Sequence, residues 1–353
     1  DWGQTLKGTQ VDAYPVVGGP KIYRNGSEGN YTYDNLQLIT QSGTSYYQLN
    51  NALELRFFAD RFNDSGNTLD TKDARLSTDI DLNPGFTFGT DGTYTGNATA
   101  TTANPKPWTP IGTASNPYTG TFNGQRHLIS GLYISGTTHA ALFHTLGIDT
   151  NNGTKTGIVQ NLGISTGNIS TTASAGSICV DNAGIIKNCY SLIPVTGGSS
   201  SSVGGLCATN TGTVQYSFTT QPTLCANIAS GTVTNSYSLL ASGSETGADT
   251  ETDATSGPKS QTFFKGGYMT WLLNNSKTAV DAITWKQSTA QSNPDAYPTY
   301  YSGSSDNNLR VICIRLHREL TSEKGALIES YYLNPTNYTL PDLSGKEVVM
   351  GDA

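Results

Sequence analysis

Side chains that could carry acid–base chemistry are sparse and scattered in this 353-residue sequence. Between Gly120 and Leu240 the ionisable residues are Arg126, His127, His139, His144, Asp149, Lys155, Asp181 and Lys187. No two acids among them share a strand face, which a general acid and base pair would require. We therefore assign no catalytic residue and no cofactor-binding residue.

Two acidic stretches could bind a metal ion. Asp79 and Asp81 stand two apart in a strand-like segment, so both carboxylates point to one face and could hold Ca²⁺. We favour a structural role for them in backbone hydrogen bonding. Asp249, Glu251 and Asp253 also alternate, but no Gly-centred calcium loop surrounds them, which favours a solvated loop. No metal site is assigned, and calcium near Asp79 and Asp81, or near Asp249 and Asp253, stays an open alternative.

Histidines and cysteines give no ligand pattern. The four histidines, His127, His139, His144 and His317, are too scattered to suggest zinc. The five cysteines, Cys179, Cys189, Cys207, Cys225 and Cys313, are an odd number and include no Cys-x-x-Cys pair. We interpret Cys179, Cys207 and Cys225 as small buried apolar residues. A disulfide or a metal site is the disfavoured alternative.

Composition excludes two classes of partner. The formal net charge is -7, and the basic residues form no stripe, so nucleic-acid binding is disfavoured. The longest apolar runs fall far short of the roughly 20 residues that cross a bilayer, so no membrane span is expected. The sequence opens at Asp1 with no leader, and any export signal was removed or lies outside this piece. Only 13% of residues are charged and Gly numbers 39, a composition that favours turns and sheets.

A short repeat runs through the middle of the chain. The segment that begins at Cys179 recurs from Cys207 and again, with one extra residue, from Cys225. Each copy holds a short apolar strand bounded by Gly and Asn, and no copy can bury its apolar face alone. Stacking such copies about 4.8 Å apart would place Cys179, Cys207 and Cys225 in one inward column. The pattern predicts a mostly β fold, built on a short right-handed parallel β-helix with a capping helix and flanking β segments.

A longer repeat links the two ends of the chain. Trp2, Gln4 and Asp12-Ala-Tyr-Pro15 recur as Trp285, Gln287 and Asp295-Ala-Tyr-Pro298, all at one constant offset. We interpret residues 1–17 as the tail of a preceding repeat unit or a flanking strand, in a chain cut from a tandem array. The alternative is that both copies pack as aromatic anchors within one domain.

The remaining segments are assigned by periodicity. Residues 18–47 are expected to form a lead-in β segment, and 48–300 the capping helix, the β-helix and a closing segment. Apolar residues at helical spacing predict a helix from Gln48 to Phe62, ended by Asn63-Asp-Ser-Gly66, and a second short helix at Tyr268–Leu273. Leu309–Leu316 alternates like a strand, so 303–353 is expected to be a truncated C-terminal β-rich module.

The repeats resemble the bacterial GLUG-motif surface proteins. The match lies in Gly204-Gly-Leu-Cys207 and Gly184-Ile-Ile-Lys-Asn-Cys-Tyr-Ser191, with similar lead-in segments from Leu76, Trp108 and Tyr118, and it covers about residues 45 to 300. The resemblance implies a β-helix on a secreted or surface-anchored bacterial protein with adhesive roles. The sequence departs from the motif where its closing Gly would fall and has His144, Val180 and Ala208 there, which puts the local turn geometry in question.

These observations favour a non-enzymatic extracellular module at the bacterial cell surface. Its role would be cell adhesion, or display and spacing within a tandem-repeat array, with a host or matrix glycan or protein as partner and neighbouring modules of the same chain beside it. The alternative is a β-helix carbohydrate-active enzyme, either a polysaccharide lyase or a glycosidase.

Overall fold

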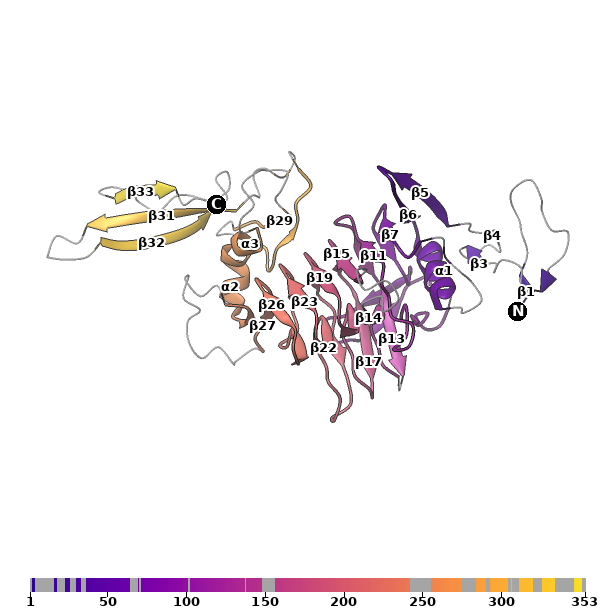
Figure 1. Cartoon of the computed structure of the whole chain (residues 1–353). Helices are drawn as coiled ribbons and strands as arrows, with labels where there is room; N and C mark the ends of the chain where they lie inside the picture. The colour runs from indigo at the N-terminus through magenta and orange to yellow at the C-terminus, as the bar shows by residue number, and fades with distance from the viewer. Residues whose placement is uncertain are drawn as a thin grey trace. The chain divides into compact units, whose positions relative to one another are not determined.

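The fold is known from a computed structural model of the chain (Figure 1). It describes residues 36–63, 69, 71–100, 102–136, 138–147, 156–241, 255–274, 284–289, 293–303, 306 and 311 with their side chains. It also describes the backbone of strands β1 (Trp2–Gly3), β2 (Val16–Val17), β3 (Tyr23–Asn25), β4 (Asn30–Thr32), β31 (Ile312–Glu319), β32 (Ala326–Leu333) and β33 (Lys346–Met350). The chain divides into two compact units, residues 1–213 with 225–232, and residues 214–224 with 233–353. The regular secondary structure of the described residues is mostly β-strand, arranged in several sheets whose pairings are mostly parallel.

The first unit contains a long sheet that joins strands far apart in the chain. It begins with the antiparallel hairpin of β5 (Gln37–Gln41) and β6 (Thr44–Leu49). Parallel strands then follow in the order β7 (Ala74–Leu76), β11 (Thr121–Asn123), β15 (Ile158–Gln160) and β19 (Ile185–Lys187). The central residues of the last three strands, Phe122, Val159 and Ile186, are fully buried. A short strand with one inward residue is therefore enough to build a core, because the neighbouring strands place an apolar residue at the same inward position.

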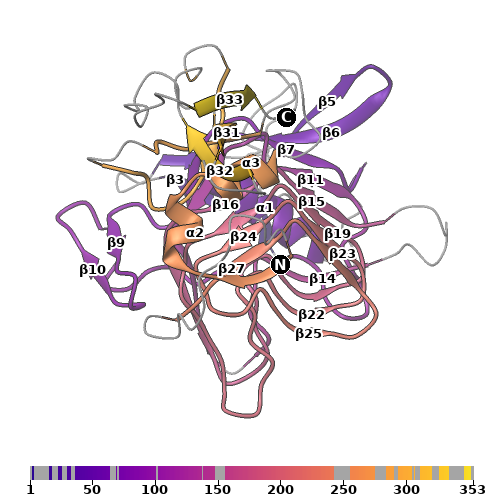
Figure 2. The same cartoon turned by 90° about the vertical axis from the view of Figure 1, so that its left-hand side faces the viewer.

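Three further sheets of this unit are parallel throughout. The second contains β8 (Ile80–Asp81), β12 (Leu128–Ser130), β16 (Gly163–Ile164) and β20 (Tyr190–Ser191). The third contains β13 (Leu132–Gly136), β17 (Gly167–Thr171) and β21 (Val195–Thr196). The fourth contains β14 (Phe143–Leu146), β18 (Cys179–Asn182), β22 (Cys207–Asn210) and β25 (Cys225–Ile228). Strands β14 and β22 of the fourth sheet are labelled in Figures 1 and 2, and β25 is labelled in Figure 2.

The predicted cysteine column is confirmed in the fourth sheet. Cys179 is the register partner of Cys207, and Cys207 that of Cys225. All three side chains are buried. Three residues further along each strand, Asn182 and Asn210 are also paired and buried, and Asn182 Nδ2 donates to Asn210 Oδ1 at 2.7 Å. Like residues are therefore stacked on like residues.

Turns between the first and second sheets contain left-handed residues, and two successive turns place an Asn there. Asn161 and Asn188 have φ of 54° and 51°, a region that Asn enters more readily than most residues. Their amides form a ladder, because Asn188 Nδ2 donates to Asn161 Oδ1 and Asn161 Nδ2 to Asn123 Oδ1, each at 3.1 Å. The side chain that permits the turn thus also links it to the next one.

Helix α1 (Ala52–Asn63) begins later than the apolar spacing predicted. Gln48 and Leu49 belong to strand β6, and Asn51 caps the helix. Its Oδ1 accepts a hydrogen bond from the Glu54 backbone N–H at 2.9 Å, while the Glu54 carboxylate accepts from the Asn50 backbone N–H at 2.6 Å. This arrangement is a variant of the capping box, in which the carboxylate accepts from the residue before the cap, and it fixes the helix start. Phe58 and Phe62 then contact the buried Tyr118 ring, with centroids 6.4 and 5.3 Å apart.

A hairpin, β9 (Phe86–Phe88) with β10 (Tyr94–Gly96), also belongs to the first unit. Its rings pack together and against Tyr133, with the Tyr94 and Tyr133 centroids 5.4 Å apart. The lead-in segments therefore contribute an antiparallel pair outside the parallel sheets.

Strands β23 (Thr213–Gln215) and β26 (Thr232–Thr234) span the division between the units. The second unit pairs β24 (Phe218–Thr219), β27 (Tyr237–Leu239) and β28 (Gly257–Lys259) in parallel. Two helices follow, α2 (Gln261–Lys265) and α3 (Tyr268–Leu273), and then the antiparallel pair β29 (Trp285–Lys286) and β30 (Thr299–Tyr300). Strands β31, β32 and β33 form an antiparallel sheet. The short helix at Tyr268–Leu273 and a strand after Leu309 are thus confirmed, whereas α2 was not predicted.

The three positions that replace the closing Gly of the repeat motif do not lie in turns. His144, Val180 and Ala208 stand inside strands β14, β18 and β22. Val180 and Ala208 are buried and pack with Ala141. The concern about turn geometry was therefore misplaced, because an extended residue needs no glycine.

Candidate functional site: a polar recess on the long sheet

A recess of about 250 Å³ opens on the long sheet of the first unit. It is lined by residues of β6, of β7 with the residue that follows it, and of the turn after β11, namely Tyr46, Gln48, Arg75, Leu76, Ser77, Gln125 and His127. Most of these side chains carry hydrogen-bonding groups, one carries a permanent positive charge, and one is aromatic. Such a lining suits a polar ligand rather than an apolar one.

The guanidinium of Arg75 lies over an aromatic ring in this recess. Its guanidinium carbon lies 3.8 Å from the centroid of the Tyr46 ring, within the range of a cation–π contact. Arg75 Nη1 also donates to Gln41 Oε1 at 3.4 Å. Among residues described with side chains, no carboxylate pairs with Arg75. The ring therefore orients a guanidinium whose remaining N–H donors suit an anionic group.

Arg75 is one member of a row that crosses the sheet. Strand register places Gln48, Arg75, Asn123, Gln160 and Lys187 side by side on five successive strands. All five are half-buried, and their neighbours on the strand point inward. Adjacent strands are about 4.8 Å apart, so the row presents a hydrogen-bonding group at that interval. It is a linear array of donors and acceptors with a cation at Arg75 and another at Lys187.

The turn that borders the recess has an unusual backbone. Gln125 and Arg126 are consecutive residues with positive φ, 55° and 71°, and the His127 N–H donates to the Gly124 carbonyl at 2.7 Å. Two left-handed residues closed in this way are the arrangement of a type I′ turn, which ordinarily contains Gly or Asn. Strain of this kind costs on the order of 1 kcal/mol per residue and often accompanies a binding site.

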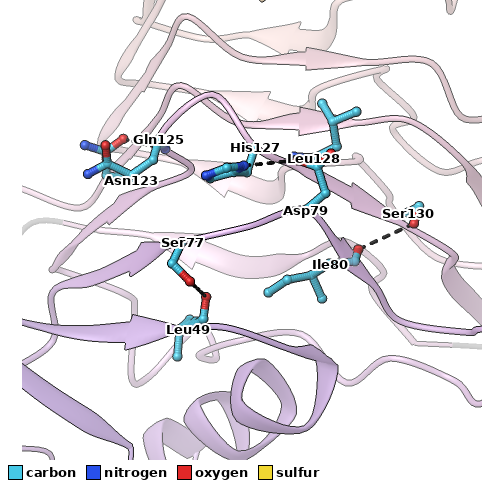
Figure 3. Close-up of polar contacts among 9 residues, drawn as sticks. All are labelled: Leu49, Ser77, Asp79, Ile80, Asn123, Gln125, His127, Leu128 and Ser130. Carbon is cyan, nitrogen blue, oxygen red and sulfur yellow. Dashed lines mark hydrogen bonds and ion pairs between the residues drawn. The ribbon is translucent and has the colours of Figure 1, made fainter. Parts of the chain in front are cut away.

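His127 is oriented by Asp79, which lies between β7 and β8. Its Nδ1 lies 3.1 Å from Asp79 Oδ1, and the same oxygen accepts the Leu128 backbone N–H at 2.9 Å (Figure 3). The neighbouring Ser77 does not complete a nucleophilic triad. Its hydroxyl donates to Asn50 Oδ1 at 2.6 Å, and Figure 3 shows it directed toward Leu49, away from His127. Asp79 therefore orients His127, while Ser77 is held by Asn50, and the three side chains are not arranged as a nucleophile with its base.

The predicted acid pair makes backbone contacts. Asp79 and Asp81 are both exposed and flank the buried Ile80. Asp81 Oδ1 accepts the Asn83 backbone N–H at 3.0 Å, and Asp79 accepts the Leu128 N–H. These contacts agree with the structural role favoured from the sequence. Among the described residues no group of three or more His, Cys, Asp or Glu side chains could hold a metal ion.

The other candidate residues are distributed as follows. The rings of His139 and His144, which looked unrelated in the sequence, have centroids 5.5 Å apart. Burial lowers the pKa of His144, and His139 lowers it further, against an opposing effect of Asp181.

Other candidates lie outside the described residues. These are the acidic stretch at Asp249, Glu251 and Asp253, the residues Asp149 and Lys155, and the side chains of Cys313 and His317. In the described part of the chain, no helix is both long and apolar enough to span a bilayer.

A second recess, of about 120 Å³, lies beside α1 and serves to anchor that helix. Arg56 donates to the carbonyl oxygens of Pro107, Leu82 and Lys106 at 2.9, 3.1 and 3.2 Å. Its guanidinium also lies 5.6 Å from the Trp108 ring centroid. Burial lowers the pKa of Arg56 to about 10, so the group stays charged at neutral pH. Its donors are committed to the backbone, which makes this recess structural.

Sequence reasoning missed Tyr46, Gln48 and Arg75 because none belongs to the short repeat. A signal was nonetheless present. In four successive parallel strands of the long sheet, a polar residue directly follows a buried apolar one, namely Arg75 after Ala74, Asn123 after Phe122, Gln160 after Val159 and Lys187 after Ile186.

Comparisons with known proteins give little further information. No protein-family model matches the chain, and no curated protein matches it. One solved structure with a similarity is described as a "putative immunoglobulin A1 protease from Bacteroides ovatus". It has 16% sequence identity and a TM-score of 0.34, over 72% of this chain and 91% of that one. A TM-score of this size does not establish a shared fold.

Proposed function

We propose that this chain is a non-enzymatic extracellular module of the bacterial cell surface that binds a glycan through the polar recess and the row beside it. In this proposal the parallel strands of the four sheets of the first unit form the faces of a right-handed parallel β-helix of the GLUG type. The module acts in adhesion, as one of several units in a tandem array, where repetition raises avidity.

The β-helix is supported by the order of the strand pairings. In each repeat the chain contributes one strand to each of the four sheets in turn, as β11, β12, β13 and β14 do. Each of these strands pairs in parallel with the equivalent strand of the next repeat. The amide ladders and the cysteine column continue from repeat to repeat at fixed register. A winding chain of short strands would produce these relationships.

The observation that carries the binding proposal is Arg75 stacked on Tyr46 within the row of Gln48, Asn123, Gln160 and Lys187. A polysaccharide presents hydroxyl groups at a short regular interval, which matches donors and acceptors repeated at about 4.8 Å. The two cations favour a glycan that carries carboxylates, because a guanidinium binds a carboxylate through two parallel hydrogen bonds. We infer that the ligand is an acidic polysaccharide.

The test is a glycan array followed by titration of the best binder by calorimetry. The array includes uronic-acid polymers and their carboxyl-reduced forms, which have the same backbone without the charge. We expect binding to the acidic polymer, at least a tenfold loss on carboxyl reduction, and a comparable loss in Arg75→Gln. Equal binding of the reduced polymer would overturn the ligand class, and an array without any bound glycan would overturn the binding function.

Two variants serve as controls. Lys265→Gln removes one exposed positive charge from α2, in the other unit, and should bind like the wild type. Lys187→Gln removes a charge from the row itself and should weaken binding less than Arg75→Gln does. Incubating the wild type with the same polymers and measuring chain length tests catalysis, and release of shorter chains would contradict the non-enzymatic assignment.

A further inference from the structure

Two cysteines of the buried column are placed to be joined covalently. Cys207 and Cys225 are register partners on the adjacent parallel strands β22 and β25, and their sulfur atoms are 3.0 Å apart. Adjacent strands bring Cα atoms to about 4.8 Å, inside the range of roughly 4.4–6.8 Å found for disulfides. This distance between the two sulfur atoms is shorter than the distance at which two unbonded thiols ordinarily pack.

The position of β25 shows what a crosslink would stabilise. In the fourth sheet the order is β14, β18, β22 and β25, so β25 is an outer strand. Residues that follow Cys225 are exposed, and Ile228 is 52% exposed although its register partner Asn210 is fully buried. This strand therefore has few apolar contacts to hold it, and edge strands of this kind are prone to fraying and to pairing with other chains.

We propose that Cys207 and Cys225 form a disulfide bond that fastens the outer strand β25 to β22. This proposal is independent of the glycan-binding function.

The reaction requires an external disulfide oxidant, such as oxidised glutathione or a thiol–disulfide oxidoreductase of the export compartment. One protein thiolate attacks the oxidant and forms a mixed disulfide, releasing one thiol of the oxidant. The second protein thiolate then attacks the mixed disulfide, forms the Cys207–Cys225 bond and releases the other thiol. The protein loses two electrons and two protons, and the oxidant is reduced to two thiols.

Burial of the two thiols in the folded structure indicates at which stage of folding the disulfide forms. The side-chain contact with Cys207 and burial both raise the pKa of Cys225, and contact with Cys179 and burial raise the pKa of Cys207. Folded thiols are therefore protonated at neutral pH and poor nucleophiles. The bond forms while β25 is still docking, and once formed it is shielded from reductants by the same burial.

The experiment counts free thiols in the whole chain after refolding in a glutathione redox buffer. Protein is denatured without reductant, alkylated, and measured by intact mass and by mapping of linked peptides. We expect three of the five cysteines to be alkylated and a linked peptide pair containing Cys207 and Cys225. Alkylation of all five, or a linked pair that joins other cysteines, would overturn the proposal.

Two kinds of variant separate the crosslink from simple packing. Cys207→Ser and Cys225→Ser should each leave all four remaining cysteines alkylated, whereas the matched buried control Cys189→Ser should leave two. Reductant should lower the Tm of Cys189→Ser as it lowers that of the wild type, and should leave the Tm of Cys225→Ser unchanged. Equal sensitivity of Cys225→Ser to reductant would contradict the assignment even if its peptide map were incomplete.

Discussion

Asn182 Nδ2 donates to Asn210 Oδ1 at 2.7 Å in a position where both side chains are almost completely excluded from solvent. Asn210 Nδ2 in turn reaches the Thr232 carbonyl at 3.3 Å. A buried amide that loses its partner retains the cost of its desolvation. Loss of one amide from the ladder would therefore leave another buried amide without its hydrogen-bond partner.

Replacing one member of this ladder should be costly. Asn210→Ala leaves the Asn182 amide without that acceptor, and we expect the free energy of unfolding to fall by about 1–3 kcal/mol. Urea denaturation followed by circular dichroism measures this. Asn227→Ala, on the exposed face of β25, is the matched control and should change stability by less than about 0.5 kcal/mol. Equal losses in the two variants would contradict a stabilising ladder.

The capping box of α1 gives a second prediction. Asn51→Ala removes the acceptor for the Glu54 N–H and should destabilise the first unit by about 0.5–2 kcal/mol. Asn51→Asp keeps an acceptor at the same place and should preserve stability. Thermal denaturation of both variants is the measurement, and an unchanged Tm in Asn51→Ala would show that packing of Phe58 and Phe62 alone sets the helix.

Close approach of neighbouring repeats gives a third prediction. A Cβ atom at Gly184 would lie 2.0 Å from the Gly157 carbonyl oxygen, so Gly184→Ala must displace the backbone of one repeat. We expect a loss of about 1–3 kcal/mol or more, or failure to accumulate folded protein. At Gly136 the same atom would meet nothing within 4 Å. Gly136→Ala should therefore express and unfold like the wild type, and similar behaviour of the two variants would contradict the stacking.

The pH dependence of stability should reflect His144. Burial and the neighbouring His139 hold its pKa below the ordinary value of 6.5, so the unfolded chain binds a proton more readily than the folded one. Stability from this group is fully present above about pH 6.5 and is lost as the pH falls toward the folded pKa. We expect urea midpoints to decline below pH 6.5 in the wild type.

The variant His144→Gln isolates this effect. Its urea midpoint should decline less steeply between pH 7 and pH 5 than that of the wild type. A decline as steep as in the wild type would show that other groups account for the pH dependence.

Much of the repeat could be predicted because its signals are local and recur. Spacing of Cys179, Cys207 and Cys225 was enough to place them opposite one another, since stacked strands keep equivalent residues in register. The start of α1 was placed too early, because Gln48 and Leu49 fit a helical spacing as well as a strand. The capping box of Asn51 and Glu54 decides between the two.

The recess could not be predicted in the same way. Tyr46 belongs to the hairpin before the repeats, Arg75 to the first parallel strand and His127 to a turn about fifty residues later. Their proximity depends on the parallel pairing of β6 with β7 and of β7 with β11. A sequence shows no direct sign of such pairing until one repeat has been aligned with the next. The positive φ of Gln125 and Arg126 has no sequence signature at all, because neither is a residue that favours it.

The fixed register of the fourth sheet coexists with unequal repeat lengths. Asn182 and Asn210 are 28 residues apart, whereas Cys207 and Cys225 are 18 apart, yet both pairs face each other directly. Extra residues are therefore accommodated outside the paired strands. Natural variation and protein engineering can add or remove peptide at these corners without shifting any paired position, so the scaffold can acquire new surface loops while its interior stays the same.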